Sequence, residues 1–407
     1  MFKDISNHSL REKESLARIA YLITVHNYRT LEDATPLFQR IRSPLNLIFI
    51  HVDTKLDLDV FYNSSLYDEI LCCPCGSYVL ASSVYSAKWS AWSMNDPTFW
   101  GMKQALLHEG KWDIFVNLSG DSMPVYRTDV IARLFAKELK GMNFVTSSSC
   151  ETGLIPTNVY YFPKWWHKRK HYTTHPDGDV EIEYISDDGE EERITLQIYF
   201  GSQWVALLPE FCSYIMKSLS RKDSLPSRFR DYLLATERLM TDETFLPTLL
   251  MHVMPFNETT VPRIFGNGSL ASHPPMTALR FERMDEHGPT AFFRFPLFQR
   301  YDVPDSSIAD IPKPWGPYFL GAYDLRSIRQ TGALYIRKVS KFVEPNLYNI
   351  FPVIRPDDIP DIFWPKEVKI SEKIDWEKRI KELDETALLR NDDAKESTHS
   401  EPDPSEL

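Results

Sequence analysis

The sequence predicts an α/β fold in which helices flank a mostly parallel central sheet. Three short apolar runs, at 19–25, 45–53 and 113–118, have the length and composition of strands that are buried on both faces. Polar helical stretches near 31–41 and 98–109 lie between them. Strands that alternate with helices in this way form βαβ units, which place their strands parallel in one sheet.

The polar residues that end these strands indicate the edge of the sheet at which a ligand would bind. Asp53 ends the second run, and the turn 119–124 follows the third. A weaker strand at 78–80 extends the pattern. In open α/β sheets, ligands bind outside the carboxyl ends of the strands. We therefore expect a site where Asp53 and the 119–124 turn meet.

Composition and charge argue against several classes of protein. The 407 residues carry a formal net charge of −11, whereas general nucleic-acid binders present a basic surface. No stretch reaches the roughly 18 apolar residues of a membrane helix, and the amino terminus lacks the apolar core of a signal peptide. The chain as written is therefore expected to be soluble, to make no membrane contact of its own, and to be cytoplasmic if it is complete.

Cysteines and asparagines give weaker indications. Five cysteines are too few for a disulfide framework in a chain of this size. The cluster at 72–75 could form half of a zinc site, but no second Cys/His pair with ligand spacing accompanies it, so no metal is expected. Five N-x-S/T sequons favour a secretory history, although Asn117 lies in a strand end expected to be buried. The sequons begin at Asn7, Asn63, Asn117, Asn257 and Asn267.

An adjacent acid pair, Asp242-Glu243, opens an apolar segment that continues through Met251. A carboxylate beside a buried run suits a general base, and acids at a helix amino terminus also suit the helix dipole, so both interpretations stand. Upstream, Gln203 and Trp204 stand at the entrance of a strand-like run. An amide and an indole near a carboxylate indicate a pocket that handles sugars.

Five motifs occur in the order seen in the core-2/I-branching glycosyltransferase family, which also contains the peptide O-xylosyltransferases. They are His51-Val52-Asp53, Lys111-Trp112-Asp113 with 117–120, 201–204, 241–245 and 333–340. The sequence resembles that family over residues 18 to 342 or so. The resemblance implies a GT-A-type fold, a UDP-sugar donor, inversion at the anomeric carbon, a hydroxyl acceptor on a glycan or glycoprotein, and no divalent metal.

The resemblance also implies roles on the acceptor side. Glu243 matches the carboxylate that removes the acceptor proton, and Asp242 is the runner-up or the partner that positions Glu243. In the xylosyltransferases an aspartate stands where this chain has Gln203. An amide cannot take the proton, which favours Glu243 as the base and GlcNAc over xylose as the sugar. Gln203 and Trp204 are expected at the acceptor, although a core tryptophan would also fit.

On the donor side, the resemblance implies cations in place of a metal. Lys338 occupies the family's lysine position with Arg337 beside it, and both are expected at the diphosphate. Arg280 is favoured over Lys313 as the family's second cation. Metal-dependent transferases hold their ion with an Asp-x-Asp motif. The Asp-x-Asp of residues 57–59 falls in an expected surface loop and is interpreted as solvated.

The nucleotide is expected between Val25, where the uracil would lie, and Asp53, which could instead cap its own turn. The family's Ser-Gly-x-Asp-x-Pro turn becomes Ser-Gly-Asp-Ser-Met-Pro at 119–124. The acid is therefore Asp121, one position early, and Ser122 stands in its usual place. Asp121 is still expected to bind the donor.

The chain is expected to divide into an N-terminal extension (1–17), a GT-A-like domain (18–345) with an insertion at about 164–192, a C-terminal extension with a charged helix (346–390), and a disordered acidic tail (391–407). The insertion could contact a polyanion or a glycan, or form a solvated loop whose opposite charges pair. Two other functions stay open: a catalytically inactive homologue that binds glycans, and an unrelated α/β nucleotide-dependent enzyme. Eukaryotic relatives are usually anchored in the Golgi membrane, so a Golgi location is expected if the chain is a fragment.

Overall fold

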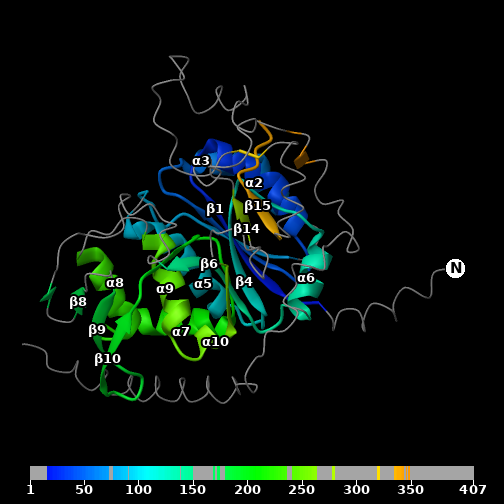
Figure 1. The fold of residues 1–407 in the computed structure, drawn as a ribbon. Coiled ribbons are helices and arrows are strands. Elements are labelled where there is room, and N and C mark those ends of the chain that lie inside the picture. The colour runs from blue at the N-terminus through cyan, green and yellow to red at the C-terminus, as the bar shows by residue number, and fades with distance from the viewer. Residues whose placement is uncertain are drawn as a thin grey trace, which may run out of the picture.

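An eight-stranded sheet lies at the centre of the molecule, with helices on both of its faces (Figure 1). The computed structural model describes residues 16–72, 77–89, 91–137, 139–149, 168–169, 172–174, 179–235, 241–263, 277–279, 319–320, 334–342, 345 and 347–348. The strands of this sheet are β1 (Ile19–Val25), β2 (Leu47–Val52), β3 (Tyr78–Ser82), β4 (Ile114–Ser119), β6 (Asn143–Ser149), β11 (Tyr199–Gly201), β12 (Ala206–Leu207) and β13 (Thr260–Arg263).

The strand order is β11-β6-β12-β4-β1-β2-β3, with β13 paired to β6. The strands β4, β1, β2 and β3 are parallel to one another, and β13 is parallel to β6. The strand β11 runs antiparallel to β6, and β12 runs antiparallel to both β4 and β6. The expected α/β class with a mostly parallel central sheet is confirmed.

Side chains of β1 alternate between two apolar cores. Ile19, Tyr21 and Ile23 pack with helices α2 and α6, whereas Ala20 and Leu22 pack on the opposite face with α5 and α7. Because both faces are covered, every residue of β1 except Thr24 is apolar or aromatic, as expected for a buried parallel strand. The helices are α2 (Tyr28–Ile41), α3 (Leu58–Tyr62), α4 (Ser65–Leu71), α5 (Asp96–Leu107), α6 (Thr128–Ala136), α7 (Pro209–Ser220), α8 (Leu225–Ala235), α9 (Phe245–His252) and α10 (Phe256–Thr259).

A second, antiparallel sheet occupies much of the expected insertion. It contains β7 (Lys168–Arg169), β8 (Tyr172–Thr174), β9 (Val180–Ile185) and β10 (Glu191–Leu196). The solvated loop expected here is wrong for β9, because Val180 and Ile182 are buried in the core that contains α7 and α8, whereas Glu191 and Glu192, at the end of the expected insertion, are exposed. Arg193, just beyond the expected insertion, forms ion pairs with Glu181 and Glu183 across β9 and β10; the expected pairing of the basic 164–171 stretch with the acidic 187–192 stretch stays a prediction.

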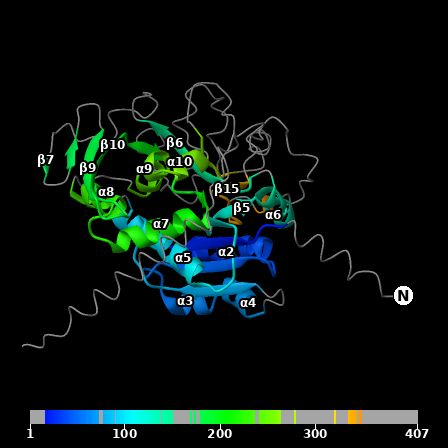
Figure 2. The same cartoon turned by 90° about the horizontal axis from the view of Figure 1, so that it is seen from below.

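A third, small sheet joins distant parts of the chain. Its strands are β5 (Ser122–Pro124), β15 (Tyr335–Arg337) and β14 (Thr277–Leu279), in the order β14-β15-β5. Figure 2 shows β15 and β5 side by side. In this pairing Arg337 lies opposite Ser122. The third sheet therefore brings the 334–342 segment to the carboxyl end of β4.

Candidate active site

The carboxyl ends of β1, β2 and β4 meet at one edge of the central sheet, as expected. The backbone N–H of Asp53 donates to the carbonyl oxygen of Val25 at 2.7 Å, and that of Gly120 donates to the carbonyl oxygen of Thr24 at 2.9 Å. A Cβ on Gly120 would lie 2.0 Å from the backbone oxygen of Thr30, in the first turn of α2. Only glycine allows α2 to approach the strand ends this closely.

The buried carboxylate of Asp53 is engaged by the backbone around it. Its Oδ1 accepts a hydrogen bond from the N–H of Lys55 at 2.9 Å, and its Oδ2 accepts one from the N–H of Ala87 at 2.9 Å. The first of these bonds caps the turn after β2, which is the alternative role that the sequence predicted for Asp53. The second fastens the segment after β3 to the end of β2. Contact between Asp53 and a nucleotide stays a prediction.

Asp121 is held between two arginines. Its Oδ1 accepts from Nε of Arg337 at 2.9 Å, and its Oδ2 accepts from both terminal nitrogens of Arg29 at 3.3 Å. The residue is only 1% exposed. Burial alone would raise the pKa of Asp121, but the charges of Arg337, Arg29 and Lys338 outweigh burial and hold this pKa well below its usual range. Asp121 is therefore ionised at any pH at which the protein works.

Arg337 and Lys338 reach this edge because β15 pairs with β5. The N–H of Val339 donates to the carbonyl oxygen of Asp121 at 2.8 Å, which fixes the 334–342 segment directly against the strand-end turn. The ring of Phe319 lies between two cations: the Arg29 guanidinium is 4.6 Å from its centroid and the Lys338 ammonium 5.4 Å. Cation–π contacts of this length are attractive and favour an ordered cation cluster.

Ser122 takes a structural place in the turn. Its hydroxyl oxygen accepts a hydrogen bond from the N–H of Ser119 at 3.1 Å, and its side chain is buried. The acid of the turn is thus Asp121, which contacts Arg337 across 216 positions of sequence. The acid of this turn stands one position earlier than in the family motif. It still lies at the end of β4, but its carboxylate contacts Arg337 and Arg29.

Trp204 and Gln203 lie beside this cluster. The Arg337 guanidinium lies 4.8 Å from the centroid of the Trp204 indole, a cation–π contact. Asn117 positions the pair: its Oδ1 accepts from the N–H of Val205 at 2.8 Å, and its Nδ2 donates to the carbonyl oxygen of Gln203 at 2.7 Å. The expected burial of Asn117 is confirmed. Stacking of Trp204 on an acceptor sugar stays a prediction.

The acid pair lies in a short 3₁₀ helix, η3 (Thr241–Glu243), that precedes α9. A neighbouring 3₁₀ helix, η1 (Trp92–Met94), fastens it: Nδ2 of Asn95 donates to Oγ1 of Thr241 at 3.1 Å, and the Trp92 ring meets that of Phe245 edge-on at 5.0 Å. The acids are therefore held against the core that lies beneath the site.

Burial gives both acids of η3 unusual protonation behaviour. Burial raises the pKa of Asp242 to about 6. Burial and the adjacent charge of Asp242 raise the pKa of Glu243 well above its ordinary value, while Arg337 opposes this shift. Among the described residues, Oδ1 of Asp242 has no hydrogen-bond partner. Glu243 thus lies within electrostatic reach of the Asp121 cluster, and the carboxylate pair binds a proton more tightly than ordinary carboxylates.

His26, at the end of β1, is surrounded by the same charges. His26 keeps an exposed face, but partial desolvation by the surrounding protein lowers its pKa to about 4; the charges of Arg337, Arg29 and Lys338 add to this shift, and Asp121 opposes it. His26 is therefore neutral near pH 7 and adds no positive charge to the cluster.

The remaining sequence predictions concern the Asp-x-Asp motif, the second cation and the C-terminal segments. Asp57 is exposed and caps α3, its Oδ1 accepting from the N–H of Asp59 at 2.9 Å, which agrees with a solvated Asp-x-Asp. Arg280 and Lys313 lie outside the described residues, as do the charged helix and the acidic tail. Arg29 and Phe319 were missed. Arg29 lies in the first turn of α2, close to the end of β1 to which the strand-end rule points.

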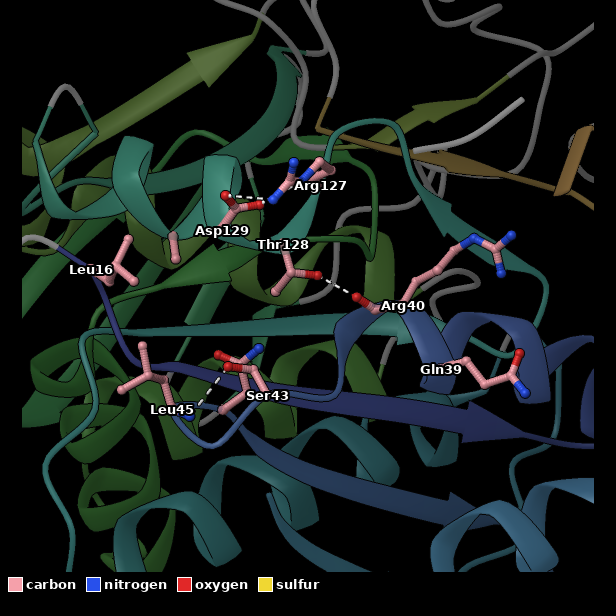
Figure 3. A pocket seen from close by; sticks show the side chains of 10 residues that line it. Leu16, Gln39, Arg40, Ser43, Leu45, Arg127, Thr128 and Asp129 are labelled. Carbon is pink, nitrogen blue, oxygen red and sulfur yellow. Dashed lines mark hydrogen bonds and ion pairs between the residues drawn. The ribbon is translucent and has the colours of Figure 1, made fainter. Parts of the chain in front are cut away.

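A cavity of about 480 Å³ lies at the opposite edge of the sheet (Figure 3). Its lining comes from the segments that precede β1 and β2, from the end of α2, and from the start of α6. The lining residues are Leu16, Gln39, Arg40, Ser43, Leu45, Asn46, Arg127, Thr128, Asp129 and Ala132. None of the residues expected at the active site lines this cavity.

Comparisons with known proteins agree with the resemblance seen in the motifs. Residues 19–265, more than half of the chain, match the family model described as Core-2/I-Branching enzyme. The chain is similar to the mouse (Mus musculus) N-acetyllactosaminide beta-1,6-N-acetylglucosaminyl-transferase, with 24% identity over 225 residues, or 53% of this chain and 50% of that protein. The chain therefore spans about half the length of that relative. Across the described residues, no helix has the length and apolar character to cross a bilayer.

The matched region contains β1, β2 and β4 together with the acid pair of η3, and so includes most of the site built above. Family and fold agree: the α/β architecture with a mostly parallel sheet is that of a GT-A-like transferase. The chain belongs to the core-2/I-branching family of glycosyltransferases.

Proposed function

We propose that this protein is an inverting glycosyltransferase that transfers a sugar from a UDP-sugar to a hydroxyl group of a glycan or glycoprotein without a divalent metal. GlcNAc is the first candidate sugar and xylose the second. The observation that carries this proposal is the arrangement of Arg337, which contacts the buried Asp121 and lies within electrostatic reach of Glu243. The charge of Arg337, which opposes the rise that burial causes in the pKa of Glu243, supports a site in which the cation cluster and this carboxylate act together.

The carboxylate supports the acceptor half of the reaction. In an inverting transfer, the acceptor oxygen forms a bond to the anomeric carbon while the bond from that carbon to the phosphate oxygen breaks. The acceptor proton passes to a base. A carboxylate with a raised pKa is a stronger base than an ordinary one, and Glu243 takes this role. Asp242, whose charge acts directly on Glu243, is the residue that adjusts its proton affinity.

The cations support the donor half. The electron pair of the broken bond leaves with UDP, whose diphosphate gains negative charge. Preorganised positive groups stabilise such developing charge strongly in a partly buried site. Arg337 and Lys338 supply these groups at the carboxyl edge of the sheet. Val25 and Asp53, at the ends of β1 and β2, are the residues we place next to the nucleoside.

The sugar identity is proposed from the relative and from the residues. The mouse relative is named as an N-acetylglucosaminyl-transferase, which favours GlcNAc. Gln203 cannot accept a proton, and this also disfavours a mechanism in which that position supplies the base. We place the protein in the Golgi or elsewhere in the secretory pathway, as the family resemblance implies.

The test is UDP release from UDP-GlcNAc and from UDP-xylose, each with a panel of glycan acceptors and with EDTA present. We expect acceptor-dependent release that EDTA leaves unchanged. Strict dependence on added magnesium would overturn the metal-free mechanism. Absence of turnover with every donor, together with retained glycan binding, would identify an inactive glycan-binding homologue.

A further inference from the structure

Arg29 has the position of a donor-binding residue that the sequence motifs do not indicate. It lies in the first turn of α2, shortly after the end of β1 at Val25. Both of its terminal nitrogens donate to Oδ2 of Asp121, and its guanidinium lies over the Phe319 ring that also faces Lys338. Its side chain keeps 24% of its surface exposed. Arg29 therefore joins the cation cluster and also reaches solvent.

Asp121 uses both oxygens to hold Arg29 and Arg337, and we name these three residues the Asp121 triad. One carboxylate shared between two guanidinium groups leaves the Asp121 triad with a net positive charge. Asp33 offsets this only in part, because it lies 3.5 Å from Arg29 and also accepts a hydrogen bond from the N–H of Lys341 at 2.9 Å. An excess of positive charge that is partly withdrawn from water favours the binding of an anion.

The arginines retain donors that Asp121 does not use. A guanidinium has five N–H groups, and Arg337 reaches Asp121 through Nε. Within the described part of the chain, the terminal nitrogens of Arg337 and the Nε of Arg29 have no hydrogen-bond acceptor. Guanidinium groups bind phosphate oxygens through two parallel hydrogen bonds. The Asp121 triad is therefore complementary to an anion with several oxygens, such as a diphosphate.

Asp121 is itself unsuited to contact such an anion. It is ionised, and two like charges in a buried site repel each other. Its contribution is geometric: it fixes the angle and separation of the two guanidinium groups before the donor arrives. Fixed hydrogen-bond donors stabilise developing charge better than donors that must reorganise.

We propose that Arg29 contacts the donor diphosphate beside Arg337, and that Asp121 is a positioning residue that holds both arginines for this contact. The proposal rests on the UDP-sugar function proposed above. The new element is that Arg29 is the second cation at the diphosphate, a role that the sequence motifs assigned to Arg280.

The first experiment measures binding of UDP and of uridine to the full chain, by calorimetry and ligand-observed NMR. For Arg29→Gln we expect UDP affinity to fall at least about tenfold, the loss of a charge-assisted bond, while uridine affinity stays unchanged. Arg29→Lys keeps the charge and should recover part of the loss. Arg42→Gln is the matched control: Arg42 ends α2 at the other edge of the sheet, pairs with Glu69, and is similarly exposed at 28%.

The outcomes separate the two proposals. Wild-type affinity for UDP in Arg29→Gln would overturn the role of Arg29 while leaving the UDP-sugar function intact. If Arg29→Gln weakens uridine binding as much as UDP binding, the residue is structural and the inference is wrong. If the wild-type protein binds neither UDP nor uridine, the proposed function itself fails.

The second experiment tests Asp121 by steady-state kinetics of Asp121→Asn, with the unfolding midpoint measured alongside. The substitution adds one net positive charge to the site. A purely electrostatic role therefore predicts tighter UDP binding and an unchanged kcat. A positioning role predicts that kcat falls at least about tenfold, because the arginines no longer meet the leaving phosphate in a fixed geometry. An unchanged kcat in a folded Asp121→Asn protein would overturn the positioning role.

Discussion

Two arginine–aspartate pairs of nearly equal length lie at opposite edges of the central sheet. At the carboxyl edge Arg337 and Asp121 are 2.9 Å apart, with side chains that are 12% and 0% exposed. At the amino edge Arg127 and Asp129 are 3.0 Å apart, with side chains that are 64% and 38% exposed. The two distances are nearly equal, but the first pair is largely buried and the second is exposed to solvent.

The two pairs differ in burial, and burial determines how strongly the charges of each pair interact. Exposed ion pairs contribute little, because water and salt screen them. Buried pairs carry a desolvation cost that only good geometry and further partners offset. Arg337 has such partners in Trp204 and, through Asp121, in Arg29. The cavity at the amino edge contains none of the residues expected at the active site. The carboxyl edge has the charged groups that we propose act on the donor.

The largest expected effect comes from removing the base at the carboxyl edge. Glu243→Gln keeps the shape of the side chain but cannot accept the acceptor proton, so kcat should fall by about 100-fold to 10,000-fold. Initial rates of UDP release at saturating donor and acceptor measure this. Asp129→Asn is the control and should keep full activity. Full activity in Glu243→Gln would remove Glu243 from its role.

The next largest effect tests the two arginines directly. Arg337→Gln should lower kcat/KM by about 100-fold or more, because a preorganised cation is lost from the leaving group. Arg127→Gln, in the exposed pair, should change kcat/KM by less than a factor of about two, since surface pairs contribute little. Equal losses in the two variants would contradict the contrast drawn between the edges.

A smaller effect, on stability, tests the close approach of α2 to the carboxyl edge. Gly120→Ala forces a Cβ toward the Thr30 backbone oxygen, and overpacking of this kind costs about 1–3 kcal/mol. Gly141→Ala is the comparison, because no atom lies within 4 Å of its Cβ and only its positive φ of 72° resists alanine, at a cost of about 1 kcal/mol. Urea unfolding of both variants measures the two costs. A smaller loss for Gly120→Ala than for Gly141→Ala would count against the packing described here.

The smallest effect concerns pH. The pKa of Asp242 is raised from 3.8 to about 6 by burial. Between these values the folded protein holds a proton that the unfolded chain has released, so the free energy of unfolding falls as pH rises through this window. Asp242→Asn should remove about 1–2 kcal/mol of that fall, while Asp129→Asn should not alter it. Unfolding curves at pH 4.5 and pH 7 measure the change in the free energy of unfolding. If this change is the same in the wild type and in Asp242→Asn, Asp242 is not its cause.

Activity should respond to pH in the opposite direction. Glu243 must be ionised to accept a proton, and burial together with Asp242 raises its pKa. The rate should therefore rise with pH over a range in which stability falls. If Glu243 is the base, as proposed, the same burial that raises its pKa also makes the stability of the protein depend on pH.

Local patterns were sufficient to predict the central sheet. The strands β1, β2 and β4 are mostly apolar because both of their faces are buried. Such runs can be recognised from the local sequence alone. The strands β9 and β10 were missed because charged residues alternate with their buried ones, for example Glu181 and Glu183 around Ile182. That alternation is typical of a sheet with one solvated face.

The site was predicted in part. Asp53, Asp121 and Glu243 carry signals in the sequence, because acids at strand ends or beside apolar runs are unusual. The partnership of Asp121 with Arg337 has no such signal, since it depends on the pairing of β5 with β15 across 216 positions. Arg29 could have been found by applying the strand-end rule to the first turn of α2 as well as to the strand ends themselves.

The most direct test of the contrast between the two edges is a crystal structure of the protein with UDP bound. We expect the diphosphate to lie at the carboxyl edge, within hydrogen-bond distance of Arg337, Lys338 and Arg29, with the uracil near Val25. A diphosphate bound instead in the cavity beside Arg40 and Arg127 would contradict this expectation.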